Sequence, residues 1–121
     1  MMDPMPALED LVWLFENEPV YPFGVEDAPW PYACVRFALT RGSLHVEVEV
    51  EPASELVKLS LSSDGDELVG LELHQVRSLV VEKQAGRELL GLVFGEQLPV
   101  EGLWLQTKPS LSVTWRTGTG E

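Results

Sequence analysis

The chain is short of basic residues and of cysteine. It has 8 lysines and arginines against 20 aspartates and glutamates in 121 residues, which gives a formal net charge of −12. Nucleic acids and anionic membrane surfaces are bound through Lys and Arg, so this balance argues against both as partners. The single cysteine, Cys34, permits no intrachain disulfide. A reducing compartment is the simplest setting for such a chain, and we expect it to be cytoplasmic.

Several motifs are also missing. The first ten residues, MMDPMPALED, lack the basic region and apolar run of a signal peptide, and no apolar run is long enough to span a membrane. There is no Walker loop, dinucleotide-binding glycine pattern, Gly-x-Ser-x-Gly elbow or CxxC pair. The acidic stretch 64–67, DGDE, lacks the remaining positions of a calcium-binding loop. We therefore expect a non-enzymatic protein without a cofactor.

Acidic residues are concentrated in the first half of the chain. Residues 1–67 carry 14 acidic and 3 basic side chains, whereas residues 68–121 carry 6 and 5. The first 35 residues contain no Lys or Arg at all. Acidity of this kind favours solubility, and an acidic face also steers a basic partner towards a protein.

Residues 6–17 carry the one convincing helix pattern. Trp13 and Leu14 widen its apolar surface, which predicts that the helix packs broadly on a sheet, and Pro19 is expected to end it. The apolar stripe follows the i, i+3, i+4, i+7 spacing and consists of Leu8, Leu11, Val12 and Phe15.

Residues 18–31 predict a long irregular loop that is rich in aromatic side chains. Four prolines forbid a regular helix or a central strand here. Structureless loops of this length are uncommon unless they serve a function or pack as a lid. The prolines are Pro19, Pro22, Pro29 and Pro31, and the aromatic residues are Tyr21, Phe23 and Trp30.

Residues 32–116 indicate a series of short strands joined by tight turns. In SLHVEVEVE, residues 43–51, four apolar residues alternate with His45, Glu47, Glu49 and Glu51, so that one face of the strand is apolar and the other is polar. Arg36, Arg41 or Lys58 on neighbouring strands could pair with these glutamates. About seven or eight such strands predict a mainly β fold, an antiparallel β-sandwich or partly open barrel with the N-terminal helix packed on it. We expect a single domain over residues 1–121, with a loose tail at 117–121.

The polar row of residues 43–51 also raises the question of a metal site. His45, Glu47 and His74 have the ligand types of a two-histidine, one-carboxylate iron centre. Nothing in the spacing brings His74 close to His45. A solvated sheet face explains the alternation fully, so the metal-dependent enzyme is a remote alternative.

The proline-rich loop carries the candidate binding residues. Tyr and Trp are frequent anchors of binding sites, and the acidic residues beside them would form a charged rim. The alternative is that the loop aromatics pack inward as a small satellite core. Trp104 is a further candidate, because Leu103 and Leu105 are expected to point inward and to turn it to the other face. The predicted partner-binding residues are Glu16, Glu18, Tyr21, Phe23, Glu26, Asp27, Trp30 and Trp104.

These features favour an acidic protein–protein interaction module. We expect it to bind a protein partner with a basic surface, and the sequence leaves the oligomeric state open. In broad character the chain resembles the small, acidic, cytoplasmic immunity proteins of bacterial toxins, a likeness of class that no motif carries. The alternative is a small-ligand-binding β-barrel in which Trp30, Trp104 and Trp115 line a pocket under the helix and loop.

Overall fold

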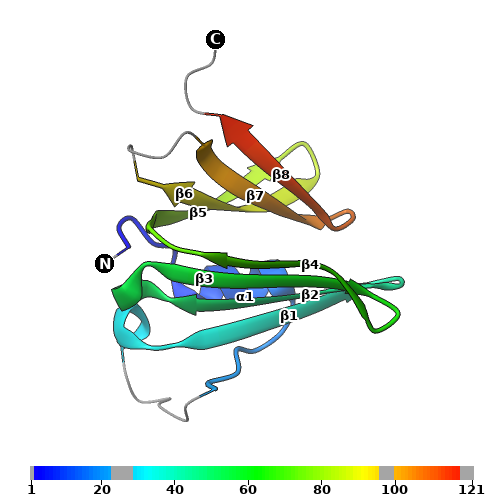
Figure 1. Ribbon diagram of the computed structural model, residues 1–121, viewed down its shortest axis with the longest axis horizontal. Coiled ribbons are helices and arrows are strands. Elements are labelled where there is room, and N and C mark those ends of the chain that lie inside the picture. Colours follow the sequence, from blue (N-terminus) through cyan, green and yellow to red (C-terminus); the bar gives the residue numbers. More distant parts are fainter. Residues whose placement is uncertain (1, 23–28, 96–99, 118–121) are drawn as a thin grey trace.

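The computed structural model describes residues 2–22, 29–95 and 100–117, which form eight strands, one α-helix and two short 3₁₀ helices. The strands make two antiparallel sheets of four, in the orders β1-β2-β3-β4 and β5-β6-β7-β8. Figure 1 shows the two sheets as two layers, with β1–β4 below β5–β8. The predicted antiparallel sandwich with a helix is confirmed. The bounds are β1 Val35–Arg41, β2 Leu44–Glu51, β3 Leu56–Ser63, β4 Asp66–Leu73, β5 Val76–Gln84, β6 Arg87–Phe94, β7 Val100–Lys108 and β8 Ser112–Thr117.

The helix α1 spans Leu8–Phe15 and is shorter than the predicted range 6–17 at both ends. At its start, the Asp10 carboxylate accepts a hydrogen bond from the backbone N–H of Ala7 at 3.3 Å. At its end, Glu16 adopts the left-handed conformation with φ of 59°. The helix therefore stops at a left-handed cap before it reaches Pro19.

The buried face of α1 contributes to the core that both sheets share. Leu11, Leu14 and Phe15 are buried and belong to this single cluster. The Phe15 ring stacks on Phe37 of β1, with the ring centroids 5.3 Å apart. Phe15 of the predicted stripe thus packs against the edge strand of the first sheet.

Strand β2 shows the alternation that the sequence predicts. Val46, Val48 and Val50 are at most 1% exposed and face the core. The opposite face carries one cross-strand row in which basic and acidic side chains alternate over four strands. In this row Arg36 pairs with Glu49, Glu49 with Lys58 and Lys58 with Glu72. The Arg36 guanidinium lies 3.0 Å from the Glu49 carboxylate, which confirms the predicted pairing.

The chain passes from the first sheet to the second at His74 and Gln75. The run 68–84 therefore forms two strands, β4 and β5, that belong to different sheets. Gln75 takes the left-handed conformation with φ of 60°, and the N–H of Val76 donates to the carbonyl of Glu55 at 3.0 Å. This crossing closes one corner of the sandwich.

Two irregular segments cover strand edges that would otherwise be unpaired. The N-terminal segment lies along β5, where the Asp3 N–H donates to the Arg77 carbonyl and the Leu79 N–H donates to the Pro4 carbonyl. On the other sheet, Val20 exchanges two backbone hydrogen bonds of 2.8 Å with Arg36 of β1. Covered edges cannot pair with other chains, so these contacts restrict where another protein can bind.

Candidate protein-binding surface

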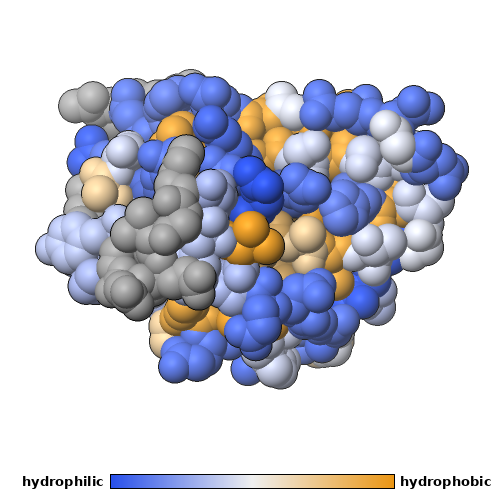
Figure 2. All heavy atoms as spheres, turned by 90° about the horizontal axis from the view of Figure 1, so that it is seen from below, coloured by the Kyte–Doolittle hydropathy of each residue, from blue (hydrophilic) through white to orange (hydrophobic). Residues whose placement is uncertain are grey.

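A groove of about 630 Å³ lies between α1 and the segment that follows it, and we call it the helix groove. It lies on the side of the molecule where residues 18–22 run below the sheets in Figure 1, and the surface there mixes apolar areas with polar ones (Figure 2). Two of the predicted binding residues, Glu18 and Tyr21, are part of it. The helix groove is lined by Leu8, Glu9, Val12, Glu18, Pro19 and Tyr21.

The aromatic residues of the predicted loop are only partly available to a partner. Tyr21 is half-buried, and Trp30 is also half-buried and donates a hydrogen bond from Nε1 to the Pro6 carbonyl at 3.0 Å. Both rings pack against the core, as the alternative of a satellite core requires. Tyr32 in the 3₁₀ helix Trp30–Tyr32 is 67% exposed. The prediction of a strand from Tyr32 onward is therefore wrong at this residue, although the nearby Pro29 and Pro31 signal an irregular backbone.

Three of the predicted binding residues, Phe23, Glu26 and Asp27, lie outside the described residues. Their part in binding stays a prediction from the sequence.

Glu16 differs from its neighbour Glu18 in its charge environment. Arg41 donates two hydrogen bonds to the Glu16 carboxylate at 3.1 and 3.2 Å, and the Lys108 ammonium lies 3.1 Å away. Hydrogen bonds from these two cations lower the pKa of Glu16 from 4.5 to about 2. Within the described residues, Glu18 has no basic partner of this kind. The charge of Glu16 is therefore balanced by Arg41 and Lys108, whereas the exposed Glu18 has no such partner among the described residues.

Trp104 lies on the outer face of the second sheet, as predicted, but it is only 3% exposed. Its indole packs closely on two glycines that leave room for it. A Cβ at Gly91 would be 2.7 Å from Nε1, and a Cβ at Gly102 would be 2.6 Å from Cζ3. Nε1 donates to the Glu82 carboxylate at 3.1 Å, and the Arg116 guanidinium covers the ring at 3.9 Å from its centroid. The ring is already covered by its own chain. Glycine inside a strand is the sequence signal for such close packing.

The outer face of the first sheet carries a second hollow of about 400 Å³. Ser60 and Gly70 are among its lining residues, and Arg36 and Lys58 offset part of the charge of its acidic residues. The polar row of SLHVEVEVE is therefore the solvated face of a sheet, in which Glu49 pairs across strands with Arg36. The acidic residues of this hollow are Glu47, Glu49, Glu67 and Glu72.

The three residues considered as metal ligands do not form one site. His45 contacts Glu47 at 3.2 Å, but it pairs with Ser62 near one end of the sheet. His74 contacts Glu72 at 3.0 Å. The residue before it, Leu73, pairs with Val57 of β3, and Val57 pairs with Val50 of β2. Val50, which is level with Leu73, lies five residues from His45 along β2, or about 17 Å at roughly 3.3 Å per residue. The ligand set of the remote alternative, His45, Glu47 and His74, is therefore not brought together in the structure.

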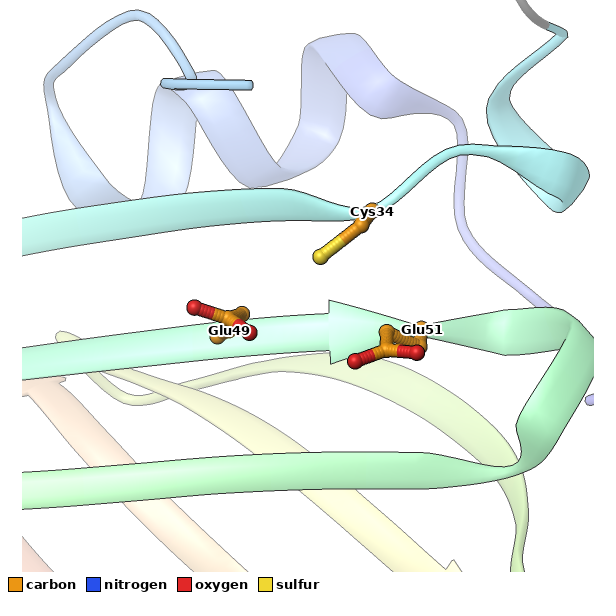
Figure 3. Close-up of side chains that lie close together, drawn as sticks. All are labelled: Cys34, Glu49 and Glu51. Atoms are coloured by element: carbon orange, nitrogen blue, oxygen red, sulfur yellow. The ribbon is translucent and has the colours of Figure 1, made fainter. Parts of the chain in front are cut away.

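A different group of possible ligands does lie close together, at the start of β1 and the end of β2. The atoms of Cys34, Glu49 and Glu51 approach within 4.8 Å of one another (Figure 3). Burial, followed by the two nearby carboxylates, raises the pKa of the Cys34 thiol to about 11. A thiol in this setting stays protonated at neutral pH, whereas nucleophilic attack requires the thiolate. Since Glu49 already pairs with Arg36, the group has a structural explanation.

The tryptophans that would line a ligand pocket in the barrel alternative do not converge. The Trp30 indole donates a hydrogen bond to the Pro6 carbonyl, and Trp104 faces outward on β7. Trp115 pairs with Leu103 on the opposite face of the same sheet and packs on Phe94, with the centroids 6.1 Å apart. The two hollows described above contain none of the three among their described lining residues.

No protein-family model and no curated protein matches this sequence. One solved structure does match in fold. It is a chain of a contact-dependent growth inhibition toxin–immunity protein complex from Klebsiella pneumoniae 342, with a TM-score of 0.76 and 11% sequence identity. The match covers 92% of this chain and 93% of that chain. At this identity the likeness shows a shared fold over nearly the whole length of both chains. Within the described residues, no helix has the length and apolar character needed to cross a membrane.

Proposed function

We propose that this protein is an immunity-type binding module that neutralises a toxin domain with a basic surface. The observation that carries the proposal is the fold shared, over 92% of this chain, with a chain of a toxin–immunity protein complex. The net charge of −12 adds support, because an acidic protein attracts a basic partner and accelerates the encounter. On this proposal the protein has no catalytic activity and acts by occupying the toxin.

The contact surface in this proposal is the helix groove and the segment that follows it. Tyr21 supplies a partly exposed ring, and Glu18 supplies a charge that no basic side chain of the described structure neutralises. Phe23, Glu26 and Asp27 extend this surface as predictions from the sequence, and Trp30 packs against the core. Glu16 acts on the surface indirectly by holding the end of α1, and Trp104 is left out because its ring is covered.

An affinity capture from the native host tests this proposal. The wild-type protein is used as bait at about 0.05 M and about 0.5 M salt, where surface charges are weakly and strongly screened. We expect one specific partner, with a basic surface and toxic when produced alone, whose capture is much reduced at high salt. A Glu18→Gln, Tyr21→Ala variant should capture less of it, whereas Tyr32→Ala should capture as much as wild type. A partner that is indifferent to both salt and the double variant would refute the assigned surface.

A further inference from the structure

We infer that the helix groove is a receptor for a single arginine side chain of the partner. This rests on the proposed function and specifies the chemical group that the surface recognises. It adds Leu8, Glu9 and Val12 of α1 to the residues expected to make contact.

The apolar part of the helix groove suits the stem of a long cationic side chain. Leu8 and Val12 lie one turn apart on α1, and Pro19 lines the groove from the following segment. Arg and Lys bury their methylene groups along such apolar surface while the charged end stays hydrated or paired. Tyr21 adds an aromatic ring, and cations are attracted to the faces of such rings.

The charged part of the helix groove is acidic, and the described part of the chain supplies no counterion to it. Glu9 and Glu18 both line it, and neither forms an ion pair with a residue that the structure describes. The contrast with Glu16, two residues before Glu18, is direct, because Arg41 and Lys108 already neutralise that carboxylate. A cation from another molecule would therefore meet two carboxylates that no described basic residue pairs with, next to Glu16, whose charge Arg41 and Lys108 already balance.

Size and geometry favour arginine over lysine as the occupant. A volume of about 630 Å³ accommodates a side chain together with part of its backbone. The guanidinium group is planar and has five N–H donors, so it can bond two carboxylates and stack on a ring at once. The ammonium of lysine is a strongly hydrated point charge that offers less to such a site.

The acidic hollow on the first sheet is a weaker candidate for the same role. Arg36 and Lys58 lie in its cross-strand row and offset part of the acidic charge, and Arg36 forms an ion pair with Glu49. It also lacks an aromatic ring among its described lining residues.

N-acetyl-arginine amide is the probe that tests the inference, with N-acetyl-citrulline amide as its uncharged equivalent. Two-dimensional NMR of the full chain follows the backbone amides of Leu8, Val12 and Tyr21 during each titration. We expect the arginine probe to shift these signals saturably with a dissociation constant in the millimolar range, and the citrulline probe to bind at least about tenfold more weakly. Equal binding of both probes would overturn the inference, as would a lack of saturable shifts up to about 50 mM.

Matched variants separate a specific site from general attraction by the acidic protein. The double variant Glu9→Gln, Glu18→Gln should bind the arginine probe at least about tenfold more weakly than wild type. Asp66→Asn, Glu101→Gln removes the same number of charges from exposed positions elsewhere and should bind as wild type does. Equal weakening by both double variants would overturn the site, provided that both variants unfold at the wild-type temperature.

The result is also independent of the toxin. Saturable arginine binding without any toxin partner would support the groove and refute the proposed function. Toxin binding that is unaffected by Glu9→Gln, Glu18→Gln would keep the proposed function and refute the groove as its arginine site.

Discussion

Arg41 binds the Glu16 carboxylate through two hydrogen bonds of 3.1 and 3.2 Å, and its Nε donates to the Thr107 carbonyl at 3.0 Å. One guanidinium thereby connects the end of α1 with strands of both sheets. Lys108 completes the arrangement by contacting Glu16 at 3.1 Å and Glu88 at 3.3 Å. This network holds in place the helix that forms one wall of the helix groove.

We expect Glu16→Gln to destabilise the protein by about 1 kcal/mol, a value reduced for solvent screening because the Glu16 side chain is 40% exposed. Its folded-state pKa of about 2 lies below the ordinary 4.5, so the wild-type contribution is full above pH 4.5 and is lost as the pH falls towards 2. Urea unfolding at several pH values measures this. The difference between wild type and variant should shrink between pH 5 and pH 2, and a constant difference would contradict the account. Glu18→Gln, the matched control, should unfold as wild type does.

We expect Gly91→Ala to destabilise the protein by about 1 to 3 kcal/mol, because the new methyl group would overlap the Trp104 indole and a Val80 methyl, each at 2.7 Å. Thermal unfolding and tryptophan fluorescence check this, since a displaced indole would enter a more polar environment. Gly95→Ala is the control, because its nearest neighbour is the flexible Arg77 side chain at 3.4 Å. Equal stability of the two variants would show that the indole does not lie on Gly91.

We expect Lys58→Glu to destabilise the protein by about 1 kcal/mol at low salt, because it places a third acid between Glu49 and Glu72 in the cross-strand row. Added salt should reduce the loss, since these side chains lie on the outer face of the sheet. Urea unfolding at two salt concentrations measures both effects. Lys58→Met keeps the apolar stem and should cost less. A loss that does not depend on salt would contradict an electrostatic origin.

Much of the fold was predictable from the sequence because it depends on local periodicity. The alternation of Val46, Val48 and Val50 with polar neighbours identifies the buried face of β2, and a register slip of one residue would bury three glutamates. The apolar stripe of α1 identifies its packing face in the same way.

Features that depend on distant residues were not predictable. Glu16 looked like a free surface acid, because Arg41, which neutralises it, lies 25 residues along the chain and Lys108 lies on the other sheet. The acidic rim predicted from neighbouring positions therefore divides into a structural carboxylate, Glu16, and a solvent-facing one, Glu18. Trp104 was assigned to the correct face, but its cover by Glu82 and Arg116 depends on strand pairing that the sequence does not encode locally.

Binding and neutralisation of a basic toxin through the helix groove can be tested directly. The most direct measurement is a calorimetric titration with the captured toxin domain, made with wild type, Glu9→Gln, Glu18→Gln and the control Asp66→Asn, Glu101→Gln. We predict one-to-one binding that the groove variant weakens at least about tenfold and the control changes by less than about threefold. Binding that both variants weaken equally, or no binding by wild type, would contradict the account.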